Sequence, residues 1–236
     1  MSANRKTAII VGILFIIGTA AGMISAALTV PIVGASDYLS KISANSGQVM
    51  AGAFFILIMG LSLAMVPVVM FPIFKKRNEV LAIGYVVFRG ALETLITIAS
   101  AACFLVLIVL SQKYVGAGAP GNSYFQTLGA VILGGHAGLT AILSIVFPIG
   151  ALMFYYLLYK ERLIPGWLSG WGFIAAILYL LGGMYDLFSS ELVILLLPML
   201  VQEMVMAGWL IVKGFNPTAV ASLSAKTSKN GLLSAA

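Results

Sequence analysis

Long apolar runs alternate with short polar segments along nearly the whole chain. Each run is continuous over about 20 residues or more, the length that a helix needs to cross the hydrocarbon core of a bilayer. The runs lack the two-residue alternation of β-strands, and a helix satisfies its own backbone hydrogen bonds in lipid. We therefore predict an all-α bundle of six transmembrane helices, over residues 7–33, 49–74, 80–110, 126–159, 166–188 and 192–212.

The apolar runs stop at clusters of charge, as they do at residues 75–79 and 160–162. From Asn216 onward the chain contains mainly Ser, Ala, Lys, Thr and Gly, with no acidic residue. Such a composition cannot bury enough apolar surface to form a core. We therefore expect one transmembrane domain over residues 1–215, followed by a disordered cytoplasmic tail over residues 216–236.

The composition supports a membrane protein, because 61% of the residues are hydrophobic and only 8% are charged. Soluble domains have roughly 45–50% apolar and about 25% charged residues. A soluble fold of this size could not hide so much apolar surface from water. Six spans and their short loops nearly use up the 236 residues, so we expect no separate soluble catalytic domain.

Lysine and arginine are distributed unevenly between alternate polar segments. With six spans, one side of the membrane would hold only Lys41 and Lys113. Cytoplasmic loops carry an excess of basic residues, so the other side is expected to be the cytoplasm and to hold both termini. That side would have Arg5, Lys6, Lys75, Lys76, Arg77, Lys160, Arg162, Lys213, Lys226 and Lys229.

Several classes of function lack support in the sequence. No basic stripe lies on a water-soluble face, so nucleic-acid binding is not expected. The single cysteine, Cys103, cannot form an intramolecular disulfide, and the single histidine, His136, is not part of an HExxH motif. No GxSxG motif or phosphate-binding loop is present. We expect no metal and no cofactor, and an enzyme is the least favoured of three alternatives.

Three charged residues lie deep within the predicted helices. Arg89 follows the loop at residues 75–79 by about ten positions, which corresponds to about 15 Å of helix. Glu93 lies one turn further, and Glu203 precedes Lys213 by a similar distance. A charge at the bilayer centre costs about 2.5–3.5 kcal/mol and is rarely found there without a partner.

Other polar residues fall at helical spacing around these charges, and we expect the resulting stripes to face each other in the interior of the bundle. The stripe on the third predicted helix continues through Tyr85, Arg89, Glu93, Thr97 and Ser100. The candidates on the later helices are His136, Thr140, Ser144, Asp186, Gln202 and Glu203.

Two interpretations of the buried charges remain open. In the first, Arg89 is a structural clamp that bridges Glu93 and Glu203 in a non-catalytic accessory or assembly protein. In the second, the net charge of −1 on these three groups must be relieved by a proton, a small cation or a cationic ligand. Arg89 would then position an anionic partner, both glutamates would titrate or bind, and His136 would relay protons. This leading hypothesis is a binding or transport site for a proton, a small cation or a polar solute.

Glycine pairs spaced four residues apart predict close helix contacts. Gly18 with Gly22, and Gly134 with Gly138, form such pairs. Such pairs are common in membrane helices, so we interpret them as packing sites within the chain and favour a homodimer face less. The bilayer itself is the one partner that the pattern requires.

Four segments resemble a known family. They are RKTAIIVGILFIIGTAAG near the start, FRGALET at residues 88–94, YYLLYKERLIPGWLSG at residues 155–170 and EMVMAGWLIVKGF at residues 203–215. The chain resembles a bacterial family known as domain of unknown function 4386, over about residues 5–215. The resemblance implies a multi-pass protein of the bacterial cytoplasmic (inner) membrane. It implies no activity, because none is assigned to the family.

Overall fold

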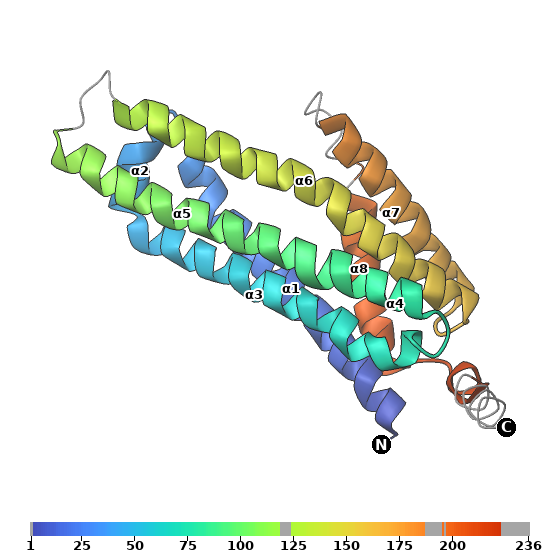
Figure 1. Ribbon diagram of the computed structural model, residues 1–236. Helices are drawn as coiled ribbons and strands as arrows, with labels where there is room; N and C mark the ends of the chain where they lie inside the picture. Colours follow the sequence, from blue (N-terminus) through green and yellow to red (C-terminus); the bar gives the residue numbers. More distant parts are fainter. Residues whose placement is uncertain (1, 119–123, 187–194, 196, 223–236) are drawn as a thin grey trace, which may run out of the picture. The chain divides into compact units, whose positions relative to one another are not determined.

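The computed structural model describes residues 2–118, 124–186, 195 and 197–222 of the chain, and this part is helical with no strands. Helices follow the chain order in Figure 1. They are α1 (Ala3–Val33), α2 (Tyr38–Ala44), α3 (Ser46–Phe74), α4 (Glu79–Tyr85), the π-helical segment η1 (Val86–Leu92), α5 (Glu93–Gly116), α6 (Tyr124–Lys160), α7 (Gly166–Asp186) and α8 (Leu197–Val212).

Five of the six predicted spans are confirmed as membrane-length helices by their length and composition: α1, α3, the continuous stretch Glu79–Gly116, α6 and α7. Only 28–50% of the most apolar stretch in each is buried, so at least half of its residues are partly or fully exposed on the protein. In water such apolar surface would be unfavourable, whereas lipid accommodates it. The α8 helix has 16 described residues, or about 24 Å, which is short of a full span. The sixth span therefore stays a prediction.

The structure adds elements that the apolar pattern does not predict. The short helix α2 lies in the polar stretch between the first two spans. The third predicted helix contains the π-helical segment η1 rather than uniform α-helix. Residues 217–222 are helical, although we expected disorder from Asn216 onward. The rest of that tail, residues 223–236, lies outside the described residues.

The chain divides into two compact units rather than one. Unit 1 comprises residues 1–16, 62–93 and 144–236, and unit 2 comprises residues 17–61 and 94–143. Each unit thus draws on segments that are far apart in the sequence.

Unit 2 has an apolar core where α1, α2, α3 and α5 meet. Its buried residues are Ile32, Ile42, Val49, Ala53, Ala101, Phe104, Leu107 and Ile108. The helices approach closely at small residues: a side chain at Gly52 would overlap Thr29, and one at Gly60 would overlap Thr97. The Ser25 hydroxyl donates to the Gly52 carbonyl at 2.8 Å, which ties α1 to α3.

The predicted glycine contact is confirmed at Gly22 on α1, whereas the two predicted on α6 are wrong. A Cβ at Gly22 would lie 2.7 Å from Met59 Sδ, so α1 and α3 are in close contact there. At Gly134 and Gly138 a Cβ would meet nothing within 4 Å. Four-residue spacing gives the two glycines a common face, but it does not ensure that a neighbouring helix covers this face.

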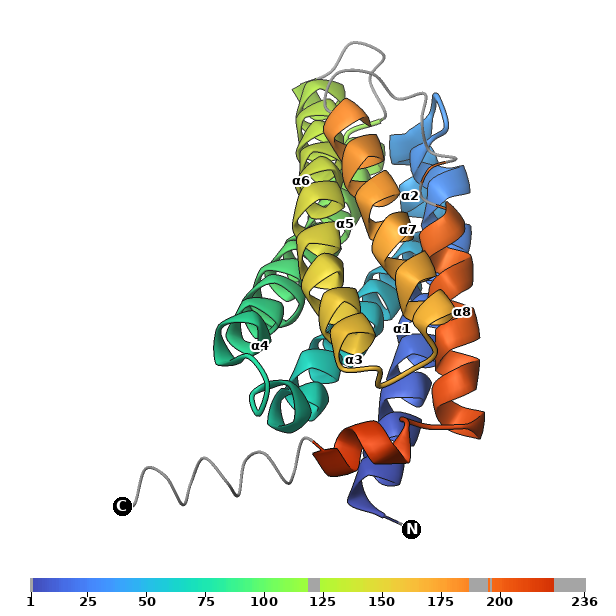
Figure 2. The ribbon, with the colours of Figure 1, turned by 90° about the vertical axis from the view of Figure 1, so that its right-hand side faces the viewer.

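Unit 1 holds its helix ends together with basic side chains. The Arg5 guanidinium donates to the carbonyls of Leu210, Ile211 and Val212 at 2.6–3.1 Å. These carbonyls lie in the last turn of α8, where the helix itself supplies no N–H donor for them. Arg77, in the loop between α3 and α4, pairs with Glu161, in the loop between α6 and α7. This ion pair joins the two loops. Figure 2 shows α7 and α8 side by side, with the helical turn at 217–222 beside the start of α1.

Candidate functional site

Arg89, Glu93 and Glu203 form a buried ionic triad within unit 1. Arg89 Nη1 lies 3.2 Å from Glu93 Oε2, and Arg89 Nη2 lies 3.2 Å from Glu203 Oε1. The three residues are 2%, 4% and 8% exposed, respectively. The structure therefore brings together the three deep charges predicted from the sequence, and the guanidinium serves both carboxylates at once.

The π-helical segment η1 carries Arg89 and ends immediately before Glu93. Its wider turn is visible in the bond from the Glu93 amide to the Phe88 carbonyl, which spans five residues instead of four. The α6 helix comes close to this segment at a glycine: a Cβ at Gly150 would lie 3.3 Å from the Arg89 amide nitrogen. Single-turn π segments are frequent at functional sites in helical proteins.

Aromatic rings enclose the guanidinium. Its central carbon lies 4.5 Å from the centroid of the Phe147 ring and 5.8 Å from that of Phe15. The negative face of an aromatic ring attracts a cation, most strongly when water is excluded. Sequence reasoning missed both phenylalanines, because a phenylalanine in an apolar run gives no signal that distinguishes a cation contact from ordinary core packing.

The triad is not fully hydrogen-bonded. Arg89 Nε and Glu93 Oε2 are buried without a hydrogen-bond partner among the described residues, although Glu93 Oε2 is within ion-pair distance of Arg89. One guanidinium faces two carboxylates, so the group carries a net charge of −1 if all three members are ionised. A buried polar atom without a partner and an excess buried charge are both costly. The described residues relieve neither the unpartnered Arg89 Nε nor the excess negative charge.

A second polar network lies beside the triad in unit 1. The Tyr155 hydroxyl donates to Gln202 Oε1 at 2.5 Å, and Gln202 Nε2 donates to the Leu168 carbonyl at 3.0 Å. These bonds join α6, α7 and α8 through a fully buried amide. Tyr85 is also buried, and its ring stacks on Phe154 at 5.1 Å between centroids. Gln202 and Tyr85 thus belong to the packing that supports the triad.

The remaining predicted site residues are not all part of this unit. Ser144 is buried in unit 1 on α6, whereas Thr97, His136 and Thr140 belong to unit 2. The Thr97 hydroxyl donates to the Thr94 carbonyl at 2.9 Å within α5. Asp186 is the last residue of α7, and its side chain lies outside the described part of the structure.

The stripe on α6 does not turn uniformly inward as predicted. His136 is half-buried, and its ring centroid lies 4.7 Å from that of Phe104, with Nε2 buried and without a hydrogen-bond partner among the described residues. Thr140 is exposed, and its hydroxyl donates to the His136 carbonyl at 3.1 Å. A threonine that bonds back within its own helix can face lipid, which explains this exception. In the described part of the chain, no three His, Cys, Asp or Glu side chains are grouped so that they could hold a metal ion.

Apolar helices of membrane-spanning length, together with a buried ionic triad, define a helical multi-pass membrane protein. The chain belongs to the family described as domain of unknown function (DUF4386), whose model matches residues 10–214. No curated protein and no solved structure matches the chain.

Proposed function

We propose that the protein binds a proton or a small cation at the Arg89–Glu93–Glu203 triad, as part of a transport or solute-binding role in the membrane. The observation that carries this proposal is the imbalance of one guanidinium against two carboxylates at a site that is at most 8% exposed. Ionisable residues inside membrane helices are typical of ion and proton pathways. Arg89 positions the two carboxylates, and the proton or cation binds between or beside them.

The proposed setting is the cytoplasmic membrane of a bacterium, with six spans and both termini in the cytoplasm. Two observations support it. Residues 10–214 match a family that the chain also resembles by motif, and the basic residues of unit 1 cluster at the ends of its helices. An excess of basic residues is typical of the cytoplasmic side.

An accessory role is the second candidate, in which the triad only holds helices together. The two ion pairs of 3.2 Å and the aromatic enclosure of Arg89 favour it, because a closed pair needs no ligand to stay in place. In that case the triad would stabilise the fold and bind nothing.

Infrared spectroscopy of the purified protein in lipid nanodiscs separates the two candidates. We expect the wild-type protein to show the carbonyl band of a protonated carboxylic acid that responds to pH or to added Na⁺ or K⁺. Glu93→Gln or Glu203→Gln should abolish that response, since each leaves Arg89 with one carboxylate and a neutral site. Glu79→Gln is the matched control, because Glu79 is exposed and pairs with Lys75 away from the triad.

A response that survives in both Glu93→Gln and Glu203→Gln would contradict the proposal. Absence of any protonated carboxyl band and of any cation effect would likewise overturn it, and would favour the accessory role instead.

A further inference from the structure

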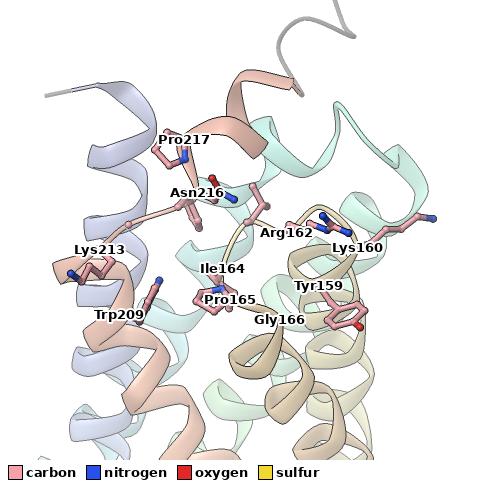
Figure 3. A pocket seen from close by; sticks show the side chains of 13 residues that line it. Tyr159, Lys160, Arg162, Ile164, Pro165, Gly166, Trp209, Lys213, Asn216 and Pro217 are labelled. Carbon is pink, nitrogen blue, oxygen red and sulfur yellow. The ribbon is translucent and has the colours of Figure 1, made fainter.

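A cavity of about 690 Å³ lies in unit 1 where three helix ends meet, and none of the three triad residues lines it. It is lined by the end of α6, the loop that leads into α7, and the segment after α8 (Figure 3). These are the points at which apolar helices stop, so the cavity lies at the boundary between the spans and water. Residues here include Lys160, Arg162, Pro165, Gly166, Trp209, Lys213 and Asn216.

The lining of the cavity is positively charged and contains no acidic residue. Arg162 and Lys213 stand on opposite sides of it in Figure 3, and both residues are exposed. Neither side chain has a carboxylate partner among the described residues, and the nearby Glu161 is already paired with Arg77. Lys160 differs, because its ammonium donates to the Tyr156 hydroxyl at 2.9 Å. Two cations are thus available to an anion.

The backbone adds donors to the same cavity. Pro165 precedes the first turn of α7, and the amides of Gly166 and Trp167 have no backbone acceptor in the described part of the chain. The first N–H groups of a helix point at whatever lies before it and favour a negative charge. Gly166 lines the cavity, so its amide adds a backbone donor to the basic side chains there.

Arg162 occupies a backbone conformation that favours glycine. Its φ is 51°, and it ends α6 with paired bonds, from the Leu163 amide to the Leu158 carbonyl and from the Arg162 amide to the Tyr159 carbonyl. Glycine is the usual residue at this position of such a motif, because it has no Cβ. The chain therefore places an arginine at the rim of the cavity at some conformational cost.

Aromatic residues flank the cavity in the manner of a membrane interface. Tyr159 and Trp209 line it, and the Trp209 ring lies 6.5 Å from that of Trp167 in an edge-on arrangement. Tryptophan and tyrosine are enriched at the level of lipid headgroups. The geometry points to a binding site for a phosphate group, supplied by the headgroup of an anionic phospholipid of the leaflet at this end of unit 1. Basic pockets between helix ends recognise anionic headgroups in this way.

Lipid titration of the purified full-length protein in detergent tests the site, with thermal stabilisation as the readout. Phosphatidylglycerol should bind more tightly than phosphatidylcholine. Arg162→Gly and Lys213→Gln should each weaken phosphatidylglycerol binding about fivefold, as expected for one basic residue near an anionic surface. Without lipid, Arg162→Gly should unfold at the same or a higher temperature than the wild type, because glycine relieves the left-handed backbone.

Lys76→Gln is the matched control, since it removes the same charge from an exposed loop residue that does not line the cavity. Equal weakening by Lys76→Gln, or equal binding of the two lipids, would overturn the site. Inorganic phosphate is titrated in parallel. Stabilisation by phosphate that Arg162→Gly abolishes would support the phosphate site with a soluble source, whereas stabilisation by phosphatidylglycerol alone supports the lipid.

Discussion

Arg89 meets its two carboxylates through different nitrogen atoms, Nη1 toward Glu93 and Nη2 toward Glu203. A planar guanidinium can do this while its central carbon lies over the Phe147 ring. A lysine ammonium is a compact charge and could not reproduce the same fork. The residue type at position 89 therefore matters beyond its charge.

Replacement of Arg89 by glutamine should strongly destabilise the protein. It would leave two buried carboxylates without their common partner, and breaking a buried ion pair in this way costs about 3–5 kcal/mol. Unfolding of the purified protein in mixed micelles measures the loss. Lys75→Gln is the control, since it breaks an exposed pair and should cost less than about 1 kcal/mol.

The double variant Arg89→Gln/Glu203→Gln tests the same charge imbalance by removing one carboxylate as well as the guanidinium. Removing one of the two stranded carboxylates should recover part of the lost stability. If Arg89→Gln and Lys75→Gln lose the same amount of stability, the triad does not stabilise the fold.

At this scale, the sequence predicted the members of the triad but not their surroundings. Three charges deep in apolar helices need partners, so Arg89, Glu93 and Glu203 could be grouped in advance. His136 shows the limit of the method. Helical spacing indicates which residues share a face, but not which neighbouring helix that face contacts, and His136 proved to contact Phe104 within unit 2.

At the scale of elements, α6 and α7 approach each other closely between Ser144 and Gly183. A Cβ built on Gly183 would lie 2.5 Å from the Ser144 carbonyl oxygen and 2.6 Å from its Cβ. Backbone atoms cannot move aside as a flexible side chain can. On the same helix, a Cβ at Gly170 would meet nothing within 4 Å.

Gly183→Ala should therefore destabilise the protein by about 1–3 kcal/mol, the usual cost of overpacking a close contact. Gly170→Ala is the matched control on α7 and should leave stability unchanged or slightly higher, because alanine favours the helix. Thermal unfolding in detergent compares the two. If Gly183→Ala unfolds at the same temperature as Gly170→Ala, the close α6–α7 contact is not present.

The ends of several elements were predicted well from the point at which the apolar pattern stops. The predicted and observed ends agree at Val33, Phe74 and Val212 and nearly agree at Lys160. The helix α2 and the π-helical segment η1 were missed for different reasons. The first has too few apolar residues to stand out, and the second has the same apolar composition as the α-helix around it.

At the scale of the molecule, the basic segments of unit 1 are linked to one another. Arg5 contacts the end of α8, and the cavity joins the segment after α8 to residues 160–166. Arg77 then connects Glu161 to the loop after α3. Among the described residues, the basic segments at residues 5, 77, 160–162 and 213 are therefore connected to one another within this unit.

Thiol labelling in cells tests the proposed topology. In a Cys103→Ala background, Ser2→Cys and Lys76→Cys should react with a membrane-impermeant reagent only after the membrane is opened. Ala117→Cys should react in intact cells, because it lies in the loop that follows α5, next to Lys113. Labelling of Ser2→Cys and Ala117→Cys from the same side would contradict the arrangement with both termini inside.

The division into interleaved units has a consequence for synthesis. All segments of unit 2 are synthesised before residue 144, whereas unit 1 still lacks α8 at that point. Glu203 follows Arg89 by 114 positions, or roughly 6–23 s at ordinary translation rates. Arg89 and Glu93 lie one turn apart on the same stretch of helix, so their charges balance before Glu203 is made. The excess negative charge therefore arrives only when α8 is synthesised.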